Sequence, residues 1–487
     1  MSDADPADAD SVQERAARSV VAVGVRTVVI RAIGFAGALI LAPLLGPSNY
    51  GVIALGLTVI VFGKFLADGG LVPGFIRREE APTHHELEGI MALQLAVAMV
   101  LTLAAAAIAA PRGEGGVAIL VMTSSLLIDA WRVPTVVDAE RRLSYGRLVR
   151  AEVLEVVVYN VFAVGLVLAG FGVMGVGIAT VLKSVSGTAM IVAGGHVGLI
   201  APVPRVRELL PTARFGLFFQ LAWLSTLARD QGLNVLLVAL SGTSALGAWA
   251  LARRLLAIVE LLFQSAWRVA LPGMARLIEA GVAPRGLLAR SLSVAATSIG
   301  FPVVLLVGTD PALVPALFGD DWTGTQDALP WVCAGFMLAI PLGTALTSLL
   351  WATDEARKVF VMGVPSVVAT LAVAAVLIPS LGAEAAGIGM FAGALVYLAG
   401  SAWFARDVFG REAFSALAPP SIAAGLASAA GWLVAGLPQD DWLGALAGGT
   451  VALALYVLML LAVDRSALFR LFRIIGRALA PATASLR

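Results

Sequence analysis

The stretch "RTVVIRAIGFAGALILAPLLGPSNYG" (residues 26–51) decides the fold class. A helix of about 20 mostly apolar residues is long enough to cross the hydrocarbon core of a bilayer. This run has that length, ends at a Gly-Pro pair, and is followed directly by a second apolar run. Arg26 and Arg31 lie inside it, where a charge is costly and usually has a specific role. The stretch therefore predicts a membrane helix that carries functional charge.

The composition extends this interpretation to the whole chain. Of 487 residues, 59% are hydrophobic and only 13% are charged, against about 45–50% and 25% in soluble domains. The mean hydropathy is +0.93. We therefore expect an all-α polytopic membrane protein. The acidic start "MSDADPADADSVQERAARS" lacks the pattern of a cleaved signal, so the first apolar run is expected to stay as a spanning helix. Cys333 is the single cysteine, which excludes an intramolecular disulfide.

Fourteen apolar runs have the length of a membrane-spanning helix. They cover residues 20–45, 49–76, 86–110, 115–137, 148–170, 173–199, 214–240, 244–268, 287–308, 327–352, 359–378, 384–405, 418–437 and 442–463.

The basic residues of the gaps between these runs alternate, as the positive-inside rule requires. Every second gap is basic. In chain order, the basic residues of these gaps are Arg77 and Arg78; Arg141, Arg142 and Arg147; Arg205, Arg207 and Arg214; Arg276 and Arg285; Arg357 and Lys358; and Arg406 and Arg411. The other gaps hold no Lys or Arg except Arg112, and the ninth gap holds Asp310, Asp320, Asp321 and Asp327. The tail is basic again, so both termini are expected in the cytoplasm.

An internal repeat organises the chain. "LLGPSNYGVIAL" (residues 44–55) and "LSGTSALGAWAL" (residues 240–251) share six residues at an offset of 196, and each joins the first two helices of a half. An even number of helices separates them, so the halves are expected to be parallel repeats, which place a substrate near mid-membrane between them. The expected domains are a tail (1–19), an N-lobe of six helices (20–199), a linker (200–213), a six-helix C-lobe (214–405), two further helices (406–463) and a basic tail (464–487).

Charges inside the predicted spans are the candidate site. The bases are Arg26, Arg31, Lys64, Lys183, Arg229, Arg253 and Arg254, and the acids are Asp68, Asp230 and Glu260. Three ion pairs are possible: Arg26–Asp68, Arg229–Asp230 and Arg254–Glu260. Seven bases against three acids leave an excess of four positive charges, which favours an anionic cargo such as a phosphate group. Helical geometry separates Arg26 from Arg31 by about 140°, so we assign Arg31 to cargo and Arg26 to Asp68.

Three weaker signals are interpreted as structural. "GFGVMG" (residues 170–175) has the glycine spacing of a dinucleotide site but no strand before it. His84 and His85 lie in a basic loop and are expected to be solvated, so no metal site is predicted. Asp320 and Asp321 suit the metal ligands of a lipid-linked sugar transferase, but the charge rule assigns them to an outer loop.

The motifs resemble one transporter family. "LGPSNYGVIAL … FLADGGLVPGFIRR" is similar to the opening of the Wzx-type oligosaccharide flippases of the multidrug/oligosaccharidyl-lipid/polysaccharide (MOP) exporter superfamily, and "LFGDDWTGTQDALPW" (residues 317–331) resembles their L-F-G-x-x-W loop. The resemblance implies a V-shaped, MATE-like carrier of two lobes plus two C-terminal helices. It also implies that lumen cations bind the cargo diphosphate, a role that maps onto Arg26, Arg31, Lys64 and Arg254.

The predicted function is a flippase, not an enzyme, that moves an undecaprenyl-diphosphate-linked oligosaccharide across the bacterial plasma membrane by alternating access, for surface polysaccharide biosynthesis. A lipid II flippase of the same superfamily and a membrane glycosyltransferase or glycan ligase remain alternatives. No cofactor is expected. Proton, sodium or membrane-potential coupling stays open, with Asp68, Asp230 and Glu260 as candidate ion sites. Partners are the lipid-linked glycan, the bilayer, and the polymerase and glycosyltransferases of the pathway, with no nucleic acid.

Overall fold

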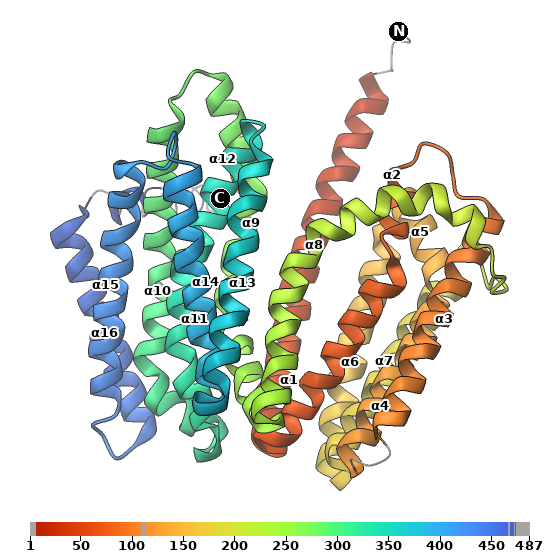
Figure 1. The fold of residues 1–487 in the computed structure, drawn as a ribbon, viewed down its shortest axis with the longest axis horizontal. Helices are drawn as coiled ribbons and strands as arrows, with labels where there is room; N and C mark the ends of the chain where they lie inside the picture. The colour runs from red at the N-terminus through yellow and green to blue at the C-terminus, as the bar shows by residue number, and fades with distance from the viewer. Residues whose placement is uncertain (1–5, 110–112, 466–467, 472, 474–487) are drawn as a thin grey trace, which may run out of the picture. The chain divides into compact units, whose positions relative to one another are not determined.

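The computed structural model describes residues 6–109, 113–465, 468–471 and 473, with no side-chain description for residues 6–28, 108–109, 206, 214–215, 217–219, 221–223, 261–272 and 356. Every regular element of this described part is helical (Figure 1). The α-helices are α1 (Pro6–Asp68), α2 (Leu71–Arg77), α3 (His84–Ala109), α4 (Gly113–Ala130), α5 (Val133–Arg141), α6 (Tyr145–Leu166), α7 (Gly172–Ala193), α8 (Val206–Ser241), α9 (Thr243–Glu279), α10 (Pro284–Phe318), α11 (Thr323–Pro341), α12 (Thr347–Ala352), α13 (Ala356–Leu381), α14 (Ala383–Phe404), α15 (Arg411–Ala435) and α16 (Asp441–Val463). Three short segments complete them: η1 (Val167–Phe171), η2 (Asp320–Trp322) and η3 (Leu342–Leu346).

Ten helical segments of the described residues are long and apolar enough to cross a membrane. Two of them are far longer than one crossing needs: Val29–Asp68 has 40 residues and Tyr145–Ala193 has 49. Each is broken by a glycine with a positive φ, Gly46 in α1 and Gly170 at the end of η1. The chain is therefore a multi-pass membrane protein, and both breaks fall where the sequence predicts a turn.

Two pairs of glycines have matching backbone conformations in the two halves of the sequence. Gly46 has φ 70° and ψ 170°, and Gly242, the residue 196 positions later, has φ 89° and ψ −177°. Gly172 before α7 and Gly382 before α14 have φ 49°, ψ −136° and φ 55°, ψ −123°. L-residues with a side chain rarely adopt a positive φ, so glycine is the natural residue at these turns. An internal repeat predicts this agreement.

Several expected spans are interrupted or shifted. The expected helix 49–76 stops at Asp68, and the chain continues as α2 after Gly69 and Gly70, both at positive φ. The expected helix 115–137 divides into α4 and α5 around a turn at 131–132. The prediction that Asp310 and Asp327 lie in the ninth loop is wrong, because α10 continues through Asp310 and α11 already includes Asp327.

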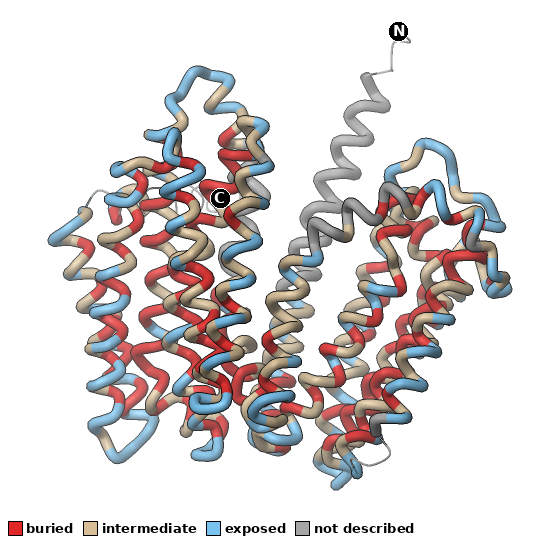
Figure 2. The backbone as a smooth tube through the Cα atoms, in the orientation of Figure 1, coloured by how far each residue is buried: buried red, intermediate tan, exposed pale blue. Residues whose placement is uncertain are grey.

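The chain divides into two compact units, residues 1–227 and 228–487. The division falls within α8. In unit 1 the core joins α1, α3, α4, α6 and α7 around the fully buried Met122, and a second cluster around Phe75 and Ile90 packs α2, α3 and α5 (Figure 2). Small residues allow the close approach of α1 and α4: a Cβ on Gly63 would lie 2.6 Å from Leu126 Cδ1.

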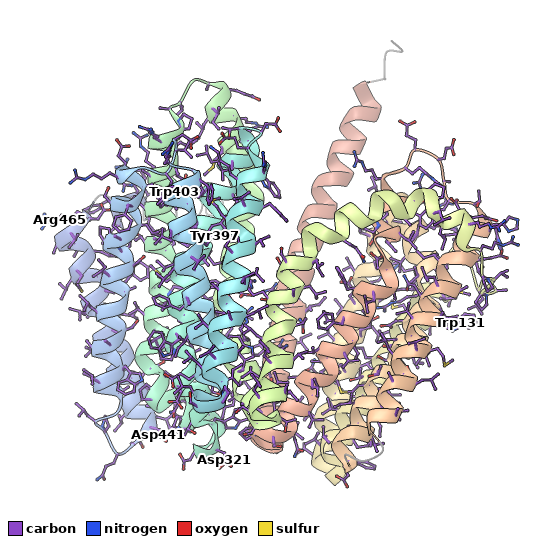
Figure 3. The ribbon with its side chains drawn as sticks, viewed as in Figure 1. Trp131, Asp321, Tyr397, Trp403, Asp441 and Arg465 are labelled. Carbon is purple, nitrogen blue, oxygen red and sulfur yellow. The ribbon has the colours of Figure 1, made fainter. Side chains whose placement is uncertain are left out.

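The helices of unit 2 also approach each other closely at glycines. The backbones of α10, α15 and α16 meet at Gly308, Gly431 and Gly448, where a Cβ on Gly431 would lie 3.0 Å from the Gly308 Cα. Asp321 and Asp441 lie at one end of the unit, and Trp403 and Arg465 lie towards the other (Figure 3).

Candidate functional site

A network of charged side chains lies inside unit 1, and its first pair joins α1 to α4. Lys64 Nζ lies 2.7 Å from Asp129 Oδ2, and the exposed fractions of the two side chains are 46% and 10%. The close packing of α1 on α4 at Gly63 brings the lysine within reach of the aspartate. The pair lies within two spanning helices, where an ion pair lowers the cost of each charge.

Arg132 continues the network from α4 to α6. It is the residue before α5, and its Nη2 lies 3.6 Å from Asp129 Oδ1 while its Nη1 forms an ion pair with Glu155 Oε1 on α6. Glu155 is 6% exposed. Room for its carboxylate comes from α7, because a Cβ on Gly187 would lie on top of the Glu155 carboxylate. A larger residue at position 187 would therefore displace this carboxylate.

Lys183 on α7 adds a third positive charge. Its Nζ lies 5.9 Å from the centre of the Tyr159 ring on α6, a cation–π distance. It interacts electrostatically with Glu155, Asp129, Lys64 and Arg132. Among the described residues it forms no ion pair of its own. Lys183 is thus the positive charge of the network that no carboxylate holds directly.

A cavity of about 190 Å³ opens beside the network. Its polar lining comes from Lys64, Asp68, Gln94, Asp129 and Arg132. Asp68 has a local role there, since its two carboxylate oxygens accept the backbone N–H groups of Gly70 and Val72 at 3.2 and 3.3 Å and so stabilise the start of α2. The cavity lies inside a membrane-spanning unit, and the lysine and arginine donors in its lining suit an anionic oxygen.

The structure places the predicted N-terminal arginines differently. The Arg26 side chain lies outside the described residues, so its assignment to Asp68 is untested. Arg31 is half-buried on α1 and has no ion pair or hydrogen bond among the described side chains. It stays a prediction for cargo binding.

The predicted charges of unit 2 form two pairs. Arg229 Nε donates to Asp230 Oδ1 at 2.8 Å, which confirms that pairing. The prediction that Arg254 pairs with Glu260 is wrong: Arg253 Nη2 lies 3.3 Å from Glu260 Oε1. A separation of seven residues is about two helical turns and keeps both side chains on one face, whereas six residues do not. The buried Nε of Arg254 has no hydrogen-bond partner in the described part of the chain.

Sequence reasoning missed three members of the network: Asp129, Arg132 and Glu155. All three lie inside the spans predicted at 115–137 and 148–170, so a complete count of charges in those spans would have found them. Their omission also means that the inferred excess of four positive charges is too large. The pairing itself joins residues far apart in sequence and is visible only in the fold.

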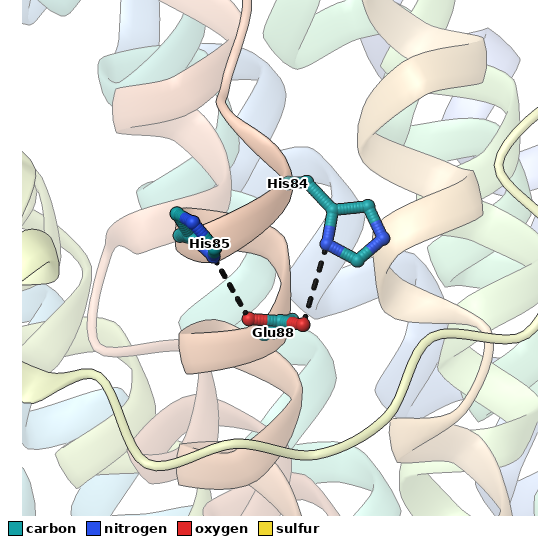
Figure 4. Close-up of side chains that lie close together, drawn as sticks. All are labelled: His84, His85 and Glu88. Carbon is teal, nitrogen blue, oxygen red and sulfur yellow. Dashed lines mark hydrogen bonds and ion pairs between the residues drawn. The ribbon is translucent and has the colours of Figure 1, made fainter.

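The two predicted loop histidines both contact Glu88. His84 and His85 open α3, and their Nδ1 atoms lie 3.3 and 3.2 Å from the two carboxylate oxygens of Glu88 (Figure 4). Their donor atoms and that carboxylate are close enough to hold a metal ion. Arg205 Nε, however, donates to the same carboxylate at 2.8 Å. A positive guanidinium on the only acid of the group disfavours a metal cation there.

The chain is similar to known proteins in sequence and in fold. A family model described as "Polysaccharide biosynthesis protein" matches residues 40–327. A solved multidrug resistance MATE family transporter of the MOP superfamily, in an inward-facing conformation, is 17% identical, with 80% of this chain and 98% of that chain covered and a TM-score of 0.56. The lipid II flippase MurJ, in an inward closed conformation, is 12% identical, with 89% and 97% covered and a TM-score of 0.60. No curated protein matches.

Proposed function

Because the chain belongs to the polysaccharide biosynthesis protein family and shares the fold of MOP superfamily transporters, we propose that it is a flippase for a polyprenyl-diphosphate-linked oligosaccharide. It carries this lipid across the bacterial plasma membrane by alternating access, for surface polysaccharide assembly. The partners proposed for it are the polymerase and glycosyltransferases that consume and produce the cargo.

The observation that supports this proposal is the charged network of unit 1. A diphosphate needs cationic donors that are already in place within the membrane, and Arg and Lys are the usual phosphate ligands. Lys183 is a cation without an ion-pair partner among the described residues, beside Lys64 and Arg132. Arg31 and Arg254 are further candidates. Among the described residues, the guanidinium of Arg31 has no ion pair or hydrogen bond, and the Nε of Arg254 has no hydrogen-bond partner.

The topology proposed for this flippase has fourteen crossings. At about 1.5 Å per residue, the 40-residue segment Val29–Asp68 is about 60 Å long, roughly twice the hydrocarbon thickness. Counting it and Tyr145–Ala193 as two crossings each, and adding α8 and α9, gives fourteen. Six helices in each repeat, two C-terminal helices and cytoplasmic termini complete the proposed arrangement.

A lipid II flippase is the second candidate, because the TM-score is 0.60 to a structure with that activity. Both cargoes present a lipid diphosphate to the protein, so the network of unit 1 suits either. The glycan separates them. Native mass spectrometry of the purified protein should show a co-purifying lipid whose mass identifies a repeat-unit oligosaccharide; a lipid II mass would select the second candidate.

A reconstituted flipping assay tests the function itself. Proteoliposomes that contain the wild-type protein should move a fluorescent lipid-diphosphate glycan between leaflets, and Lys183→Met should reduce the rate at least tenfold. Lys358→Met, which removes a surface lysine paired with Asp407, is the matched control and should keep the wild-type rate. Equal rates for both variants, or no transport by the wild type, would contradict the proposal.

A further inference from the structure

A cavity of about 450 Å³ in unit 2 shares no residue with the charged network of unit 1. It lies between the start of α13 and the end of α14, and its lining residues are Glu355, Arg357, Lys358, Val361 and Phe404. Both helices are long and apolar enough to cross a membrane. The cavity therefore lies where two spanning helices leave the hydrocarbon, at the level of the lipid headgroups.

Large aromatic side chains are exposed at this end of α13 and α14. Phe360 is 63% exposed, Trp403 73% and Phe404 46%, and Trp403 lies towards the same end of unit 2 as Arg465 (Figure 3). Aromatic side chains concentrate at the boundary between bilayer and water. Since Phe404 and Arg357 are both exposed and both line the cavity, the cavity opens towards that boundary.

The acids beside the cavity are already held by bases. Lys358 Nζ lies 2.9 Å from Glu355 Oε1 and 2.9 Å from Asp407 Oδ2. Asp407 also interacts electrostatically with Arg285, whose Nε donates to the backbone carbonyl of Asp407 at 2.6 Å. With Arg357, three bases meet two acids, so one positive charge is left over.

Arg357 carries the positive charge that remains. It is exposed and forms no ion pair or hydrogen bond among the described residues. Asp354 and Arg406, on the same two segments of chain, are both exposed and opposite in sign, so they leave the balance unchanged. A guanidinium without a partner in the wall of an open cavity suits a phosphate, because its planar fork can bind two oxygens.

The rest of the wall selects the kind of phosphate. Val361 and Phe404 are apolar, and the volume is that of a site for a small organic molecule rather than for an inorganic ion. An amphiphile with one phosphate charge and attached hydrocarbon matches both parts of the wall. Basic pockets between membrane helices on the cytoplasmic side recognise anionic lipid headgroups, and the topology proposed above places this end of unit 2 on that side.

We propose that this cavity binds an anionic phospholipid of the phosphatidylglycerol type, with its phosphodiester on Arg357 and its glycerol and first methylene groups against Val361 and Phe404. A zwitterionic lipid carries an ammonium group beside its phosphate, which the excess positive charge disfavours. The proposal does not rest on the flippase function, because it requires only a membrane around α13 and α14.

Native mass spectrometry of the delipidated full-length protein measures the binding. Phosphatidylglycerol and phosphatidylethanolamine with identical acyl chains are titrated separately. The wild type should bind the first phosphatidylglycerol about tenfold more tightly than phosphatidylethanolamine, and Arg357→Gln should lose this preference. Arg406→Gln removes an exposed arginine outside the cavity lining, so it should keep the preference. All three proteins should have the same melting temperature, because both arginines are exposed.

A photoreactive phosphatidylglycerol with a diazirine in its acyl chain locates the site. The label should map to α13 and α14 around Val361 and Phe404 in the wild type and in Arg406→Gln, but not in Arg357→Gln. Excess phosphatidylglycerol should suppress it, whereas inorganic phosphate should not.

Three results would overturn the proposal: equal affinity of the wild type for the two lipids, a preference that survives Arg357→Gln, or a label that avoids these two helices. Stronger competition by a polyprenyl diphosphate than by phosphatidylglycerol would also overturn it, because the cavity would then belong to the transported lipid.

Discussion

Lys64 on α1 and Asp129 on α4 form a 2.7 Å ion pair in which the lysine is half exposed and the aspartate is buried. Asp129 also has Arg132 at 3.6 Å, so it serves two cations, whereas Lys64 has one acid. The two partners are therefore unequal. Removal of the aspartate leaves Lys64 without its acid and Arg132 with Glu155 alone, whereas removal of the lysine leaves an acid that still faces Arg132.

The first prediction follows from this asymmetry. Asp129→Asn should destabilise the protein by about 3 kcal/mol, in the range for breaking a buried pair, and Lys64→Met by about 1 kcal/mol. The loss of stability in the double variant should be smaller than the sum of the two single losses, because neither charge is then left without its partner. Thermal unfolding of purified protein in detergent measures all three. Additive losses would show that the pair contributes nothing.

Gly187 supports the second prediction. Because its missing side chain makes room for the carboxylate of Glu155, Gly187→Ala should push Glu155 from Arg132 and lower the free energy of unfolding by about 2–4 kcal/mol, as for a broken buried pair. Gly165→Ala on α6 is the control, since a Cβ there meets nothing within 4 Å. That variant should be neutral or slightly stabilising, because alanine favours helix. Similar losses in both would refute the steric argument.

The network also shows how far sequence reasoning reaches. Long apolar runs fix the class of fold, because lipid admits few alternatives to helices, and the glycine turns at Gly46 and Gly242 were predictable from a repeated motif. The partners of each charge were not. Lys64 and Asp129 are far apart in sequence, so only packing reveals their contact. The choice of Arg253 over Arg254 for Glu260 follows from helix periodicity and was available from the sequence.

A third prediction concerns the start of α3. Thr83 and Glu86 form a capping box: Thr83 N donates to Glu86 Oε2 at 2.8 Å and Glu86 N donates to Thr83 Oγ1 at 3.2 Å. Arg78 holds the same buried carboxylate at 2.7 and 2.8 Å. Arg78→Ala should therefore cost about 3 kcal/mol, because it leaves Glu86 as a buried charge without its cation.

The companion variant separates charge from capping. Arg78→Ala combined with Glu86→Gln keeps an acceptor for Thr83 and removes the buried charge, so it should recover part of the melting temperature lost in Arg78→Ala. A double variant no more stable than Arg78→Ala would show that the cost does not come from the unpaired carboxylate.

The fourth prediction is a pH dependence. Lys358 Nζ lies 3.0 and 2.9 Å from the two carboxylate oxygens of Asp407, and this hydrogen-bonded pair holds the pKa of Asp407 below its usual range. An acid with a lowered folded pKa stabilises the protein above its unfolded pKa of about 3.9, and that contribution is lost as pH falls through the folded value. The pair is half exposed, so its contribution is under about 1 kcal/mol.

Asp407→Asn should therefore melt slightly below the wild type at pH 6–7, and the difference should vanish as the pH falls below about 4. Asp441→Asn, which removes an exposed acid, serves as the comparison at each pH. A difference that grows on acidification would contradict the sign derived from the pair.

The last prediction tests the contact between α2 and α8 inside unit 1. Gly70 has φ 72°, and a Cβ built on it would lie 2.1 Å from the backbone oxygen of Gly216. Gly69 has φ 54° and nothing within 4 Å of such a Cβ. Alanine strains the backbone about equally at both positions, at about 1 kcal/mol. Only at position 70 does it also force two backbones apart, so Gly70→Ala should be far more destabilising than Gly69→Ala.

We expect Gly69→Ala to lower the melting temperature by a few degrees and Gly70→Ala to give little folded protein, because backbone cannot move aside as a flexible side chain can. Gly216→Ala should share the severe effect, since a Cβ there would lie 2.3 Å from the backbone oxygen of Gly70. Size-exclusion profiles and thermal unfolding after identical purification provide the measurement. Equal behaviour of Gly69→Ala and Gly70→Ala would mean that backbone strain, and not the approach of α8, explains the glycine at position 70.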